Sequence, residues 1–178
     1  MHRYLVVANQ TLGGEQLLSA IRDHMATGPC HFHLLVPATA ATDLSPEYLA
    51  AAEAARTAQQ GEADADRRQA RQLLEDEVQE PGHDDAGEDL GRRLARERLR
   101  HELGRLRELG AEVSGEVGVA DPVEAIEVVQ HRWEFDGIIL STLPGRRSRW
   151  LAMDLPARIR RTFKLPVTHV TGPAGPAS

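Results

Sequence analysis

The sequence predicts an α/β domain with a doubly wound parallel sheet, because short apolar strands alternate with amphipathic helices along its 178 residues. A strand, a helix and a second strand follow one another within the first 40 residues, which is the spacing of a βαβ unit. Residues 138–140 form an apolar strand without alternation, which indicates a sheet covered on both faces. We therefore expect one domain over 1–170 with five parallel strands in the order 3-2-1-4-5.

The N-terminal part of the chain supplies the first βαβ unit. Residues 4–8 are a short apolar run that ends at Asn9. A helical pattern of apolar residues follows over 17–25 and stops at Gly28, which precedes a proline. Residues 31–36 are a second apolar run. The first strand is expected to lie in the centre of the sheet.

Regular structure resumes with a helix over 90–110, where leucines recur at helical spacing and Gly110 is the expected end. Residues 112–119 alternate and predict a third strand. Asp121 and Pro122 then start a helix, because aspartate is a favoured N-cap and proline fits the first helical position.

The last third of the domain completes the alternation. Trp133 is expected to help bury the helix that starts at Asp121. Residues 137–140 predict the fourth strand, 151–163 a helix that starts near Asp154, and 165–170 the fifth strand. The tail over 171–178 is rich in glycine and proline and is expected to be disordered.

An acidic segment interrupts this pattern over 43–88. Residues 43–90 hold 14 acidic residues and four arginines, with few apolar residues to anchor them to a core. This composition predicts an inserted, solvated helical arm. A protein partner for this arm is one possible use of its charge.

Composition narrows the functional classes. The formal net charge of −6 argues against general nucleic-acid binding. Cys30 is the only cysteine, so the sequence predicts neither an intrachain disulfide nor a cysteine-rich zinc site. No apolar run approaches a membrane span, and the apolar N-terminus fits a first strand better than a signal peptide. We expect a cytoplasmic location and no membrane partner.

Three runs of residues, taken in their order along the chain, resemble those of a known protein family. Residues 121–126, 136–141 and 165–167, with a helix before the last, resemble the C-terminal half of the universal stress protein family. The resemblance extends over 1–40 and 88–170 and leaves out the acidic arm. It implies the adenine nucleotide alpha-hydrolase-like fold, a homodimer through the last strand, and a stress or signalling role without turnover.

The same resemblance implies a site for ATP or another adenine nucleotide. Family members that bind ATP carry an aspartate after the first strand and, after the fourth, Gly-x-x-Gly, nine residues, then glycine and serine or threonine. Here the aspartate position holds Asn9, the glycine positions hold Ser141 and Pro144, and the later pair falls near Met153 and Asp154. Because proline donates no backbone hydrogen bond and a carboxylate repels phosphate, we expect weak or absent ATP binding.

The loop after the fourth strand carries three arginines that could hold a small anion in place of the backbone cradle. In this architecture, ligands lie at the carboxyl ends of the strands. The predicted binding residues are Asn9, Val36, Gly118, Ser141, Thr142, Gly145, Arg146, Arg147, Ser148, Arg149 and Asp154.

Other chemistry finds little support in the sequence. His31 and His33 lie on one face of a strand, but no third metal ligand is identifiable, so we expect no metal site. Walker, nucleophile-elbow and His-Glu-x-x-His motifs are absent from the sequence, and we expect no catalytic residues. The alternatives are an interaction module that uses the acidic arm, and an enzyme of the wider adenine nucleotide alpha-hydrolase-like group.

Overall fold

The structure is a computed structural model, which describes residues 1–38, 50, 54, 57, 90–144 and 149–173. The predictions for the acidic arm over 43–88 fall outside the described residues, apart from three isolated positions that are helical. Residues 174–178 of the expected tail also lie outside them.

The described residues form alternating strands and helices around one sheet. The elements are β1 (His2–Val7), α1 (Glu15–Thr27), β2 (Cys30–Pro37), α3 (Leu90–Glu108), β3 (Glu112–Gly118), α4 (Pro122–Gln130), β4 (Gly137–Thr142), α5 (Arg149–Ala152), α6 (Leu155–Phe163) and β5 (Val167–Thr171). All four strand pairs are parallel, and the order is β3-β2-β1-β4-β5. The predicted sheet, with β1 in its centre, is confirmed.

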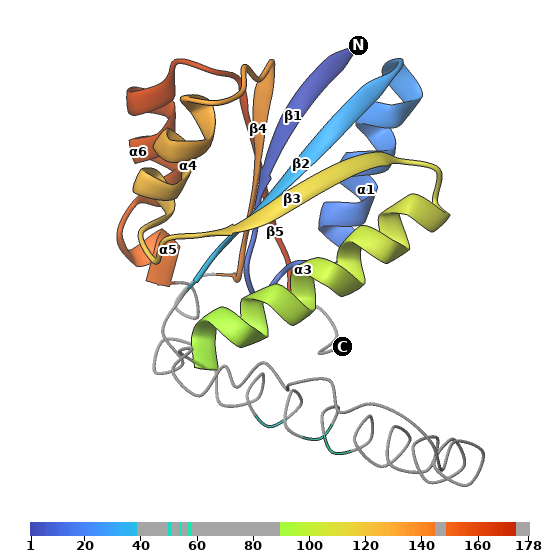
Figure 1. Cartoon of the computed structure of the whole chain (residues 1–178). Coiled ribbons are helices and arrows are strands. Elements are labelled where there is room, and N and C mark those ends of the chain that lie inside the picture. The colour runs from blue at the N-terminus through green and yellow to red at the C-terminus, as the bar shows by residue number, and fades with distance from the viewer. Residues whose placement is uncertain (39–49, 51–53, 55–56, 58–89, 145–148, 174–178) are drawn as a thin grey trace, which may run out of the picture.

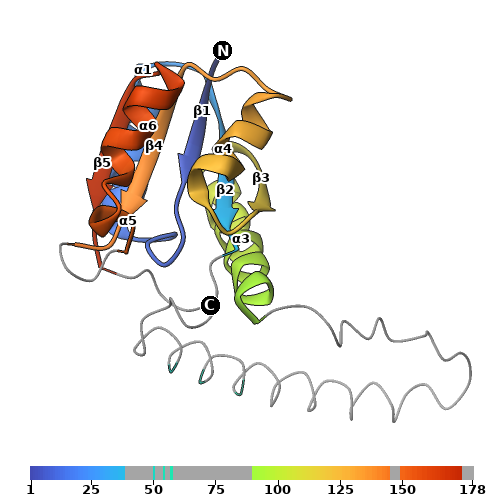
Figure 2. The ribbon, with the colours of Figure 1, turned by 90° about the vertical axis from the view of Figure 1, so that its left-hand side faces the viewer.

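The helices cover the sheet on both faces, as Figure 1 shows, with α1 and α3 on one side and α4 and α6 on the other. Alternate residues of each strand point to opposite faces. In β1, Val6 packs with the α1 and α3 side chains, whereas Leu5 packs with those of α4 and α6. Figure 2 shows α6 lying along β4 and β5 on its face of the sheet. The sheet therefore has two hydrophobic cores.

Two helix boundaries form where the sequence predicts them. The Asp121 side chain accepts hydrogen bonds from the backbone N–H groups of Val123, at 2.8 Å, and Glu124, at 3.1 Å, at the start of α4. Gly110 follows α3 with a φ of +82°, which glycine adopts without steric cost. Capping and glycine signals therefore fix both ends of the β3 region.

Two details differ from the prediction. Trp133 does not bury α4, because that helix ends at Gln130 and the tryptophan side chain is 47% exposed. The helical region before β5 is divided into α5 and α6, and Asp154 lies between them with a φ of +50°. Trp150, in α5, is buried.

Candidate functional site

The carboxyl end of the sheet is where the sequence places the binding site. β1 pairs with β2 on one side and with β4 on the other, so the strand order reverses at β1. The chain leaves the sheet at this point when β1 ends. Ligands of open α/β sheets bind at such a switch point. Asn9 lies directly after β1 and is 6% exposed.

Asn9 is held by protein groups. Its amide oxygen accepts a hydrogen bond from Nη1 of Arg98, and its amide nitrogen donates to the Pro37 carbonyl at 3.4 Å. Arg98 lies on α3, is 4% exposed, and donates from Nε to the Leu94 carbonyl at 3.1 Å. The side chain that replaces the family's aspartate therefore connects β1 with β2 and α3.

Two more charged residues of α3 contact the loop between β1 and α1. Arg105 donates from Nη1 to the Gly13 carbonyl at 3.2 Å and forms a 3.2 Å ion pair with Glu102. Gly13 has a φ of +83°, and a Cβ there would lie 2.9 Å from the Arg105 and Glu102 side chains. Burial raises the pKa of Glu102, against the opposing effect of Arg105. With Arg98, these side chains form a charged stripe on α3 that covers the loop.

The end of β4 is also engaged within the protein. Ser141 and Thr142 are buried. The Thr142 hydroxyl lies 2.9 Å from Nε2 of His169 on β5, and the Thr142 carbonyl accepts from the Gly172 N–H at 3.1 Å. Burial lowers the pKa of His169, with a further contribution from the charge of Arg160.

Two predicted site residues have packing roles. Val36 is fully buried in β2 and belongs to the core beneath α1 and α3. Gly118 ends β3, where a Cβ would lie 2.8 Å from Cβ of Ala125 and 2.9 Å from Cδ1 of Leu35. The glycine therefore allows α4 to approach the sheet closely.

The basic loop is only partly described. Gly145, Arg146, Arg147 and Ser148 lie outside the described residues, and Arg149 is described only as the first residue of α5. Asp154 occupies the N-cap position of α6 without a side-chain capping bond, and its carboxylate lies 3.8 Å from Arg161. In the described ranges, no group of three or more potential metal-ligating side chains is present.

Two buried polar atoms at the carboxyl end have no hydrogen-bond partner among the described residues. They are the hydroxyl oxygen of Thr11, in the loop after β1, and Oε1 of Glu102. A buried polar atom without a partner costs free energy in the folded state. Even so, the side chains of Asn9 and Thr142, which lie closest to the switch point, are bonded within the protein.

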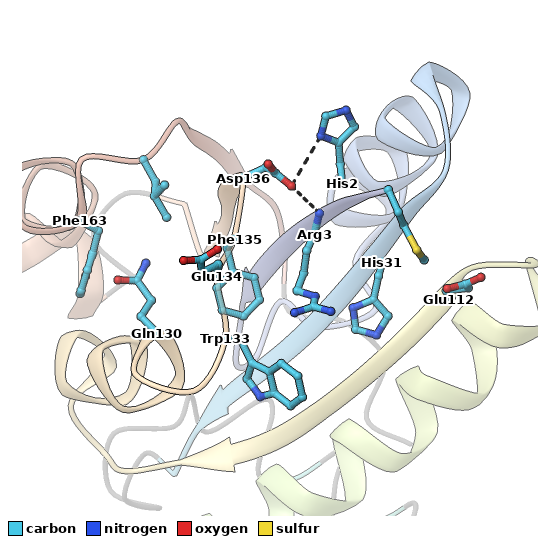
Figure 3. Close-up of a pocket in the computed structure, with 12 residues that line it drawn as sticks. His2, Arg3, His31, Glu112, Gln130, Trp133, Glu134, Phe135, Asp136 and Phe163 are labelled. Atoms are coloured by element: carbon cyan, nitrogen blue, oxygen red, sulfur yellow. Dashed lines mark hydrogen bonds and ion pairs between the residues drawn. The ribbon is translucent and has the colours of Figure 1, made fainter.

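A cavity of about 750 Å³ lies at the opposite, amino end of the sheet (Figure 3). It opens between the starts of the strands and the segment that leads from α4 into β4. Its lining is Met1, His2, Arg3, His31, Glu112, Gln130, Trp133, Glu134, Phe135, Asp136, Phe163 and Leu165. Its volume lies within the usual range of small-molecule sites.

Arg3 and Trp133 meet in this cavity. The guanidinium carbon of Arg3 lies 5.1 Å from the centre of the Trp133 ring, which is a cation–π distance. The Arg3 backbone N–H donates to the Asp136 carboxylate at 2.7 Å, and Nδ1 of His2 lies 3.6 Å from the same carboxylate. The hydrogen bond from Arg3 and the charge of His2 lower the pKa of Asp136.

A row of three side chains crosses the sheet at this end. Arg3 on β1 is the register partner of His31 on β2, and His31 is the register partner of Glu112 on β3. All three line the cavity. Burial and the charge of Arg3 lower the pKa of His31, whereas the charge of Glu112 acts in the opposite direction.

Beneath this row is a polar cluster on β2 and β3. The Ser114 hydroxyl lies 2.8 Å from Nδ1 of His33 and 3.2 Å from Nε2 of His31. Nε2 of His33 lies 3.7 Å from Glu116, which also pairs with Arg132. Burial is the main cause of the lowered pKa of His33. Within the described part of the chain, Nδ1 of His31 and Nε2 of His33 have no hydrogen-bond partner.

Sequence reasoning located the switch point but missed Arg98, His169 and the cavity. A signal for Arg98 exists, because Arg98, Glu102 and Arg105 recur at spacings of four and three residues on a helix otherwise recognised by its leucines. The cavity leaves no local signal in the sequence, because Arg3 and Glu112 lie beside the starts of separate strands and only the register of the sheet brings them together.

No protein-family model matches this sequence, and no curated protein matches it significantly. None of the helices within the described residues combines the length and the hydropathy of a membrane span.

Proposed function

We propose that this chain is a non-catalytic, ligand-binding regulatory domain of the universal stress protein type, with the adenine nucleotide alpha-hydrolase-like fold. The parallel sheet in the order 3-2-1-4-5 supports this proposal, together with the resemblance of residues 121–126, 136–141 and 165–167. In this proposal, ATP binds weakly or not at all at the carboxyl end of the sheet.

The observation that carries the proposal of weak or absent ATP binding is the hydrogen bond between Asn9 and Arg98. A nucleotide at the switch point would have to compete with a buried guanidinium for the side chain that replaces the family's aspartate. The Thr142 hydroxyl is likewise engaged, with His169. Because hydrogen bonds to charged groups contribute about 1.5–3 kcal/mol each, the lost phosphate cradle lowers nucleotide affinity by orders of magnitude.

Any ligand of this end is then a small anion attracted by the loop over 141–149. Arginines on a loop attract anions with less geometric selection than a backbone cradle. Such binding depends on charge and therefore weakens with salt.

Calorimetry with ATP and with inorganic phosphate at low salt tests the proposal. We expect weak, salt-sensitive binding that is lost in the Arg146→Ala/Arg147→Ala double variant. Micromolar ATP binding that survives both substitutions would contradict it. If no anion binds at all, the alternative of an interaction module that uses residues 43–88 gains support.

We also propose a homodimer through β5. This strand lies at the edge of the sheet and pairs with β4 on one side only in the described residues, so its outer backbone groups can pair with a second copy. Sedimentation should show a dimer at micromolar concentration, and amide exchange over 167–171 should slow as the concentration rises. A monomer at all concentrations would contradict this proposal.

A further inference from the structure

The cavity at the amino end of the sheet holds charged groups that lack partners. Among the described residues, the Arg3 guanidinium makes no ion pair or hydrogen bond, and its contact is the face of Trp133. The carboxylates of Glu112 and Glu134, which line the same cavity, also make no ion pair or hydrogen bond there. Asp136 differs from them, because the Arg3 backbone and His2 already contact its carboxylate.

The unpaired charges have opposite signs. Neighbouring strands are about 4.8 Å apart, so the Arg3 and Glu112 backbones, two strands apart, are separated by about 10 Å across His31. In Figure 3, Glu112 and Glu134 lie on opposite sides of Arg3. A positive centre is therefore flanked by negative groups within one cavity.

This arrangement selects against ligands with a single charge. An anion would pair with Arg3 but would be repelled by the carboxylates of Glu112, Glu134 and Asp136. A cation would be attracted by these carboxylates but repelled by Arg3. A ligand that carries both charges can place its carboxylate on Arg3 and its ammonium group on a glutamate, which satisfies both kinds of group.

The cavity also offers an apolar surface. Trp133 is 47% exposed, although an indole of this size is usually covered, and Phe135 and Phe163 line the cavity with it. The Arg3 guanidinium lies over the indole, which limits its freedom before a ligand binds. An aliphatic or aromatic group attached to a zwitterion would pack on these rings.

We propose that this cavity binds a small zwitterion of the amino-acid class, either a free amino acid or a dipeptide. Arg3 binds the carboxylate, Glu112 or Glu134 binds the ammonium group, and Trp133 contacts the side chain. This site is separate from the carboxyl end of the sheet, so it does not depend on whether ATP or another anion binds there.

A ligand screen on the unmodified chain tests the charge requirement. The standard L-amino acids and glycyl-L-leucine are titrated to millimolar concentration and followed by amide NMR shifts of residues around the cavity. The best probe is then compared with its N-acetyl and its C-terminal amide derivatives, each of which lacks one charge. We expect both derivatives to bind at least about tenfold more weakly. If no zwitterion binds, or if either derivative binds equally well, the proposal is overturned.

Variants test the residues. Arg3→Gln and Glu112→Gln should each weaken binding of the best probe about tenfold or more, whereas the exposed controls Arg22→Gln on α1 and Glu127→Gln on α4 should not. Thermal unfolding confirms that each variant folds. Unchanged affinity in a folded Arg3→Gln variant would overturn the proposal. If a variant does not fold, the comparison of the two derivatives on the unmodified chain still tests the proposal. Whether the best probe is a free amino acid or the dipeptide distinguishes the two ligand sources.

Discussion

The two ends of the sheet differ in how their polar groups are partnered. At the carboxyl end, Asn9 forms a hydrogen bond with Arg98 and Thr142 forms one with His169. Asn9 and Thr142 are both buried. At the amino end, the guanidinium of Arg3 has only a ring for a partner among the described residues. In this fold the first end is the usual ligand site and the second is not.

This difference shows why topology alone is a poor guide to the position of a site. A switch point creates space for a ligand only if the side chains around it leave their polar groups available. Here the charged stripe on α3 closes over the loop after β1 through Arg98 and Arg105. Short α4 instead leaves the starts of β1 to β3 uncovered on the other face, where the cavity lies.

Replacing one arginine by methionine at each end of the sheet gives the largest expected difference between the two ends. Arg98→Met should destabilise the fold by about 2–4 kcal/mol, because it leaves the buried Asn9 oxygen without the guanidinium. Arg3→Met should cost less than about 1 kcal/mol, since only a cation–π contact is lost. Urea unfolding measures both values. Equal costs would show that the two arginines have similar structural roles.

A pH titration of stability compares the histidines of the two ends. Burial lowers the pKa values of His31 and His33 at the amino end and of His169 at the carboxyl end. As the pH falls below the unfolded value of about 6.5, the unfolded chain takes up protons that the folded chain does not. The free energy of unfolding should therefore decrease as the pH falls through about 6.5, and it should level off below the folded pKa values.

The two ends should contribute unequally to this dependence. A His31→Gln/His33→Gln variant should lose more of it than His169→Gln, because two groups titrate at the amino end. Glu102 acts in the opposite direction, since its raised pKa lets the folded state take up a proton first. A Glu102→Gln background removes that contribution. Stability that rises on acidification in this background would contradict the prediction.

Two buried threonines at the carboxyl end test whether partners, and not burial alone, decide the energetics. Thr142→Val should cost about 1–2 kcal/mol, because Nε2 of His169 loses its partner. Thr11→Val should be neutral within about 0.5 kcal/mol or stabilising, since the Thr11 hydroxyl has no partner among the described residues. Chemical denaturation at neutral pH measures both. A large loss in Thr11→Val would indicate that its hydroxyl binds a group outside the described residues.

Strand order and helix boundaries were predictable because they depend on local patterns. Apolar runs, the Asp121 cap and Gly110 each act within a few residues, and the sheet order follows from chirality and the central apolar run over 4–8. The expectation that Trp133 helps to bury α4 is wrong, because helical periodicity alone does not show that α4 ends at Gln130.

The candidate site was less predictable because its contacts join distant segments. Asn9 and Arg98 are 89 positions apart, and the intervening sequence includes the acidic segment. The row of Arg3, His31 and Glu112 exists only once the register of three strands is known. Charged residues are common at strand starts and in the solvated loops beside them. The convergence of three such residues on one cavity therefore leaves no local pattern in the sequence. The weak or absent ATP binding stays a prediction.

The smallest expected effects concern α6, which connects the two ends. Asp154 at its start and Lys164 at its end both adopt left-handed backbone conformations, with φ values of +50° and +51°. This conformation costs an ordinary residue about 1–2 kcal/mol, whereas glycine adopts it freely but loses about 0.5–1 kcal/mol of stability through its flexibility when unfolded. Lys164→Gly should therefore stabilise the protein by up to about 1 kcal/mol.

Asp154→Gly should gain less, because aspartate tolerates the left-handed region better than lysine does. Its ion pair with Arg161 is long and exposed, so the loss of that pair should change little. Lys164→Ala is the matched control, since alanine removes the lysine side chain but keeps the backbone strain, and it should not stabilise. Urea unfolding of the three variants measures the differences. If Asp154→Gly stabilises more than Lys164→Gly, the backbone at the carboxyl end of the sheet is the more strained of the two, contrary to this prediction.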